Sequence, residues 1–214
     1  MLNSNSTDHE LNVAILIYDG VELVDMNGPL DAFLHANRYN GNRYNVYTVS
    51  ATMDAIISEG NVVTIVPKYD ITNCPNPDII VIPGIINKQV NETIITWLTA
   101  MCENPERIIM SVCIGFFTLA QTGILSGKKA TTHYLSISDA HNKYPDVIFE
   151  KNVRYVADGN IITTGGITSG IDGALYLIER LDNTIIAQQT ADVMVYNREA
   201  PLPPFTILPP YFSI

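Results

Sequence analysis

The segment Arg107 to Gly123, RIIMSVCIGFFTLAQTG, decides the fold class. Residues 107–112 form a mostly apolar run that predicts a buried strand. Residues 115–121 have the spacing of a short amphipathic helix, and Thr122-Gly123 is a typical C-terminal stop. Cys113 therefore lies where a strand turns into a helix. A strand followed directly by a helix is the repeating unit of parallel α/β sheets.

The same alternation of strands and helices extends along the chain on both sides of this segment. It predicts an α/β fold with a mainly parallel sheet and helices on both faces. Further strands are expected at residues 12–18, 45–51, 61–66, 78–83, 129–132, 152–157 and 161–164, and helices near residues 28–36 and at 90–102, 168–181 and 183–196.

Length and composition indicate one domain with a large core. The chain has 214 residues, of which 47% are hydrophobic and only 16% are charged, so much of it is expected to be buried. We expect a disordered or loosely held tail at residues 1–10, an α/β domain at 11–196 and an extended, proline-rich arm at 197–214. The arm has five prolines, which exclude a helix or a central strand.

Charge and hydropathy exclude several classes of partner. The formal charge of −10 repels nucleic acids and anionic membranes, and no basic patch offsets it. The apolar runs are strand-length, far below the roughly 20 residues of a membrane span. The first ten residues have no secretory features, and the three cysteines do not form an even disulfide set, so we expect a cytoplasmic location.

Cys113 is the candidate nucleophile. At a strand-to-helix turn, a cysteine lies at the carboxyl edge of the sheet and faces the positive end of the helix dipole, which favours the thiolate. The backbone N–H of Ile114 is expected to point at an anion formed beside the sulfur. The alternative is a buried core cysteine, because free Cys packs as a small hydrophobe. Cys74 and Cys102 lack this context and are interpreted as structural.

Several segments together resemble a known family. They are VDMNGPLDAF, DIIVIPG, SVCIGFFTLAQTGILSGKKATTHY, DGNIITTGGITSGIDGALYLIE and, near the C-terminus, APLPPF. In order and spacing they resemble the ThiJ/PfpI superfamily (class I glutamine amidotransferase-like), and most closely its isonitrile hydratase branch, over residues 13–205. The resemblance implies a flavodoxin-like sandwich, a homodimer, Cys113 as the catalytic nucleophile and Asp25 as an essential acid.

Asp25 and His133 are the candidate partners of Cys113. Asp25 follows the first strand, so its carboxyl group can reach the same sheet edge and share a proton with the sulfur. Alternatively, it is a helix cap or a solvated loop residue. His133 follows Cys113 by 20 residues, and either completes a Cys/His pair or has a packing role. No histidines or carboxylates have metal-ligand spacing, so no metal site is expected.

The sequence departs from the family pattern at two positions. Ile114 replaces the threonine that characteristically follows the cysteine in isonitrile hydratases, and Pro83-Gly84-Ile85 replaces a P-G-G motif. The N–H of Ile85 is therefore the candidate second oxyanion donor, under a bulkier side chain. Gly84, Gly166 and Ile167 are expected to line the substrate pocket. Gly165-Gly166 indicates close backbone packing near the cysteine rather than a phosphate loop.

These features predict a hydro-lyase that converts R–N≡C to an N-substituted formamide without a cofactor. Cys113 attacks the terminal carbon, and Asp25 transfers protons. A glyoxalase-like reaction on reactive aldehydes, with Cys113 and His133, is a second hypothesis. A third is a non-enzymatic ligand-sensing domain related to AraC-type regulators, for which DNA binding is expected to need a separate protein.

Overall fold

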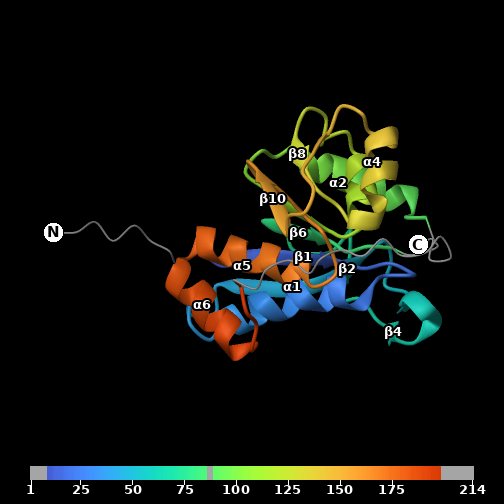
Figure 1. Cartoon of the computed structure of the whole chain (residues 1–214). Helices are drawn as coiled ribbons and strands as arrows, with labels where there is room; N and C mark the ends of the chain where they lie inside the picture. Colours follow the sequence, from blue (N-terminus) through green and yellow to red (C-terminus); the bar gives the residue numbers. More distant parts are fainter. Residues whose placement is uncertain (1–8, 86–88, 199–214) are drawn as a thin grey trace.

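The computed structural model describes residues 9–85 and 89–198, and within them seven strands form one sheet (Figure 1). The strand order is β10-β11-β7-β6-β1-β2-β5, and every neighbouring pair is parallel except the β10–β11 hairpin. The strands are β1 (Leu11–Leu16), β2 (Tyr44–Ser50), β5 (Tyr69–Asp70), β6 (Ile79–Ile82), β7 (Ile108–Val112), β10 (Tyr155–Asp158) and β11 (Ile161–Thr164).

The central strands form the core. Every residue of β6, β7 and β11 is buried, which explains why these segments are mostly apolar rather than alternating. Ile79 pairs with Val13 of β1 on one side and with Ile108 of β7 on the other. Because these strands are parallel, the segments that follow β1, β6, β7 and β11 meet at one edge of the sheet.

Helices cover both faces of the sheet, as the sequence predicts. On one face lie α1 (Leu23–Ala36), α5 (Ser169–Leu181) and α6 (Thr184–Val193), which pack against one another (Figure 1). On the other face lie α2 (Glu92–Cys102), α3 (Gly115–Ala120) and α4 (Ile137–Lys143). Smaller elements are the pairs β3 (Ile56–Ile57) with β4 (Thr64–Ile65) and β8 (Lys129–Ala130) with β9 (Ile148–Phe149), and the 3-10 turns η1 (Glu59–Asn61) and η2 (Tyr134–Ser136).

Helix α1 begins five residues before the expected start near Gly28. The Glu22 side chain caps it by accepting a hydrogen bond from the backbone N–H of Asp25, at 2.5 Å. A side-chain oxygen at this position satisfies one of the N–H groups that a helix start leaves unpaired. Asp25 therefore occupies the first turn of α1, and Glu22 takes the capping role that was an alternative for Asp25.

Helix α4 and the short strands β3, β5 and β9 were not expected from the sequence. Helix α4 buries only Ile137 and Ala140 along seven residues, which is too little for a recognisable apolar period. The expected proline-rich arm lies outside the described residues from position 199 onward, as does most of the expected N-terminal tail. In the described part of the chain, no helix is long and apolar enough to cross a membrane.

Candidate active site

Cys113 is held in a sharp turn between β7 and α3. Its φ of 56° is in the left-handed region, which a side chain other than glycine rarely adopts. Two hydrogen bonds fix this geometry: the Cys113 N–H donates to the Thr164 carbonyl at 3.2 Å, and the Thr132 hydroxyl donates to the Cys113 carbonyl at 2.8 Å. The side chain is only 6% exposed. Cys113 therefore lies at the carboxyl edge of the sheet, but it is covered.

Gly166 provides part of this cover. It follows β11 with a φ of 70°, and a Cβ atom at this position would lie 2.3 Å from Cys113 Cβ and 2.6 Å from its Sγ. No side chain fits in that space, so glycine is required both by the contact and by the backbone conformation. The close packing of the Gly165-Gly166 backbone on the cysteine agrees with the interpretation from sequence.

Asp25 lies beside Cys113 and is fully buried. Its Oδ2 atom accepts a hydrogen bond from the Gly84 N–H at 2.8 Å, whereas Oδ1 has no partner among the described residues. A Cβ atom on Gly84 would lie 2.7 Å from Asp25 Oδ2 and 3.6 Å from Cys113 Cβ. Gly84 thus packs against both the carboxyl group and the cysteine. The fold brings together Asp25 from the first turn of α1, Gly84 from the loop after β6 and Cys113 from the turn after β7.

Both groups favour their protonated, neutral forms. Burial, followed by repulsion from the nearby Glu22, holds the pKa of Asp25 well above its usual range, against the Gly84 hydrogen bond. Burial, followed by repulsion from Asp25, raises the pKa of the Cys113 thiol. The Ile114 N–H donates to the sulfur and opposes this shift. The expectation that the helix terminus lowers the pKa of Cys113 is therefore wrong, because burial, followed by the carboxyl groups of Asp25 and Glu22, raises this pKa.

The two isoleucines that depart from the family pattern, Ile85 and Ile114, line the same cavity. Ile114 is the N-cap residue of α3, and Ile85 forms an isolated bridge with Val21. The volume of this cavity is about 760 Å³. The Ile114 N–H donates to the cysteine sulfur, and its expected role as an oxyanion donor stays a prediction. The oxyanion role of the Ile85 N–H stays a prediction.

In the described part of the chain, the side chain of His133 forms no hydrogen bond with Cys113. Its ring packs at a tilt against that of Tyr134, with centroids 4.7 Å apart, and its buried Nδ1 has no partner among the described residues. Burial lowers the pKa of His133, so the imidazole is neutral at pH 7. The neighbouring Thr132, rather than His133, binds the cysteine backbone.

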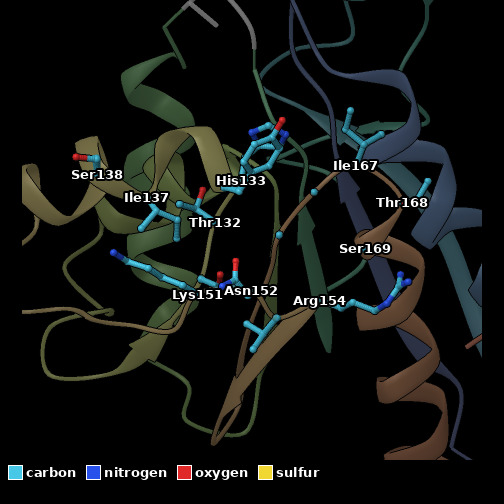
Figure 2. A pocket seen from close by; sticks show the side chains of 15 residues that line it. Thr132, His133, Ile137, Ser138, Lys151, Asn152, Arg154, Ile167, Thr168 and Ser169 are labelled. Carbon is cyan, nitrogen blue, oxygen red and sulfur yellow. The ribbon is translucent and has the colours of Figure 1, made fainter. Parts of the chain in front are cut away.

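A cavity of about 410 Å³ opens beside Gly166 (Figure 2). Gly166, Ile167 and His133 line it, whereas Gly84 does not, although it was expected in the pocket. Cys113 and Asp25 do not line it either, so Gly166 is the link between the cavity and the cysteine. The cavity also includes Thr132, Lys151 and Arg154, which the sequence did not single out because they lie on short, irregular segments. Among the described residues, no group of three His, Cys, Asp or Glu side chains has the arrangement of a metal site.

The fold and this site define a flavodoxin-like α/β protein with a cysteine at the strand-to-helix elbow. Comparison with known proteins identifies the family. The chain belongs to the DJ-1/PfpI family, whose model matches residues 11–180. The resemblance inferred from the sequence motifs is thus confirmed.

Individual relatives have different activities. The isonitrile hydratase of Pseudomonas putida is 30% identical over 199 residues, covering 91% of this chain and 81% of that protein. The HTH-type transcriptional regulator GbdR of Pseudomonas aeruginosa is 24% identical over 191 residues, and this chain spans only 51% of its length. Among solved structures, a ThiJ/PfpI family protein from Pseudomonas syringae aligns with a TM-score of 0.77 and 27% identity, covering 92% of this chain and 78% of that one.

Proposed function

We propose that this protein hydrates an isonitrile to an N-substituted formamide, with Cys113 as nucleophile and Asp25 as proton carrier. The observation that carries the proposal is a buried carboxyl group next to the elbow cysteine, with one oxygen held by Gly84 and the other without a partner among the described residues. The similarity to isonitrile hydratase supports the choice of substrate class.

In the first half of the reaction, the thiol adds across the terminal carbon of R–N≡C. The sulfur forms a bond to this carbon while the thiol proton passes to an Asp25 oxygen, and the carboxylic proton of Asp25 passes to the same carbon. The product is a thioimidate, R–N=CH–S–Cys113. A protonated Asp25 suits this step, because a neutral carboxyl group both accepts and donates a proton.

In the second half, water attacks the thioimidate carbon. One water proton passes through Asp25 to the nitrogen and gives R–NH–CH(OH)–S–Cys113. The carbon–sulfur bond then breaks, the hydroxyl proton returns to the sulfur through Asp25, and R–NH–CHO leaves. The overall change is the addition of one water molecule, and the thiol and carboxyl groups are regenerated.

The test is an assay of the purified protein with cyclohexyl isocyanide, which follows formamide production. We expect turnover by the wild type and none by Cys113→Ala or Asp25→Asn. Asp31→Asn is the matched control, because Asp31 lies on the same helix α1 but is exposed. Activity of Cys113→Ala close to that of the wild type would refute the mechanism.

The similarity to a transcriptional regulator favours one second candidate, a ligand-sensing domain. Under this alternative, Cys113 is structural and the cavity beside Gly166 binds a ligand without reaction. Ligand binding by the wild type without turnover of any isonitrile, aldehyde or related electrophile supports it.

The glyoxalase-like alternative needs a working Cys113–His133 pair, so His133→Ala should abolish aldehyde conversion if that reaction occurs.

We also propose that the protein is a cytoplasmic homodimer. Three cysteines without disulfide bonds are compatible with a reducing compartment. The low charged fraction of the chain and its family membership support association of two copies.

A further inference from the structure

The cavity beside Gly166 differs in charge from the rest of the protein. The whole chain has 22 acidic and 12 basic residues, yet the 15 residues that line the cavity include Lys151 and Arg154 and no aspartate or glutamate. The remaining polar residues of the lining are neutral, with hydroxyl, amide and imidazole groups. In a protein with a formal charge of −10, a cavity with only cationic charges indicates selection for an anion.

The two cations have different surroundings. Arg154 donates from Nη1 to the Asp172 carboxylate at 2.9 Å, so Asp172 offsets much of its charge. Lys151 is exposed and has no ion pair within the described part of the chain. Figure 2 shows Lys151 and Arg154 on opposite sides of the cavity, with their charged ends directed away from each other, and His133 and Ile167 on a third side. Lys151 is therefore the cation available to a ligand.

We propose that this cavity binds a small organic carboxylate, with the carboxylate group near Lys151 and the other end of the molecule toward Gly166 and Cys113. The volume of about 410 Å³ is within the range of small-molecule sites. Combined with the hydration reaction, on which this step rests, the proposal defines the substrate as an isonitrile that carries a carboxylate.

Binding tests this proposal without any reaction. The Cys113→Ala variant is titrated by calorimetry with N-formylglycine and with the similarly shaped N-formylglycinamide, in which a neutral carboxamide replaces the carboxylate. We expect N-formylglycine to bind about two- to five-fold more tightly, as one partly solvated ion pair allows, and the preference to fall with added salt.

The matched variants are Lys151→Gln and Lys129→Gln, each in the Cys113→Ala background. Lys129 is also exposed, but it lies outside the cavity and pairs with Glu150 at 3.2 Å. The preference for the carboxylate should disappear in Lys151→Gln and persist in Lys129→Gln. Equal affinities for the two ligands in the parent, no binding of either at millimolar concentration, or an unchanged preference in Lys151→Gln would overturn the proposal.

The wild-type protein separates this proposal from the hydration reaction. If the wild type turns over cyclohexyl isocyanide but does not prefer isocyanoacetate over a neutral isonitrile, this result contradicts the carboxylate site and leaves the hydration reaction supported. A carboxylate preference in binding that depends on Lys151, without turnover of any isonitrile, supports the site and contradicts the reaction.

Discussion

Replacement of Gly166 by alanine tests how tightly the β11–α5 loop covers Cys113. The added methyl group would lie 2.3 Å from Cys113 Cβ and 2.6 Å from both its Cα and Sγ, so the loop or the cysteine must move. Alanine at a φ of 70° also costs about 1–2 kcal/mol of backbone energy. The forced contact adds about 1–3 kcal/mol, the usual cost of overpacking a well-packed site.

These two contributions predict a loss of about 2–5 kcal/mol in the free energy of unfolding for Gly166→Ala. For a chain of this size, that corresponds to a decrease of about 4–20 °C in the thermal midpoint. Gly159→Ala is the matched control, because Gly159 has a φ of 67° in the β10–β11 turn and a Cβ atom there meets nothing within 4 Å. It carries only the backbone cost, and its decrease should be about 2–8 °C.

Differential scanning fluorimetry of the two variants isolates the contact energy. Both substitutions reduce the entropy of the unfolded chain in the same way, so this effect cancels in the comparison. A Gly166→Ala midpoint no lower than that of Gly159→Ala would refute the close packing of Gly166 on the cysteine. If the packing is as described, Gly166→Ala also reduces isonitrile turnover, because it displaces the sulfur from Asp25, while Gly159→Ala does not.

Three further predictions concern the protonation of the site and the assembly of the chain. The pKa of Asp25 is raised in the folded protein, so Asp25 keeps its proton at pH values above its unfolded pKa of about 3.9. Its contribution to stability is therefore complete below that pH and is lost as the pH rises. The thermal midpoint of Asp25→Asn should rise relative to that of the wild type between pH 5 and pH 8, and a constant difference between the two midpoints would contradict the raised pKa. Iodoacetamide at pH 8, followed by peptide mapping, should label the half-buried Cys74 and Cys102 faster than Cys113, whose thiol is both covered and protonated; preferential labelling of Cys113 would show instead an accessible thiolate. Truncation after Asn197 removes the proline-rich arm and should lower the dimer fraction in light scattering; an unchanged dimer with unchanged stability would show that the arm makes no contribution.

Much of the fold was predictable because its central strands are buried on both faces. Runs such as residues 78–83 have no polar alternation, and the structure places β6 (Ile79–Ile82) there. The start of α1 was not predictable from apolar periodicity, because it depends on one capping side chain, Glu22. Helix α4 was not predictable for a different reason, because it buries too few residues to leave an apolar pattern in the sequence.

The composition of the site was more predictable than its electrostatics. The sequence places Cys113 and Asp25 after two parallel strands, and this topology brings them to one edge of the sheet. The direction of the pKa shift of Cys113 depends on its burial and on the carboxyl groups around it, which no local motif reveals. The cavity was missed in part, because Lys151 and Arg154 reach it from the irregular segment before β10.

The neutral state of the cysteine and carboxyl pair has a consequence for the proposed substrate. If Cys113 and Asp25 were both ionised, two negative charges would lie near Glu22 and repel an incoming carboxylate. Protonation of both removes this repulsion, and it also leaves the pair with the two protons that the addition to the isonitrile carbon must move. The same burial that raises both pKa values therefore serves substrate entry and proton transfer. In the proposed reaction, a thiolate is formed only as the carbon–sulfur bond forms, so a persistent thiolate is not required.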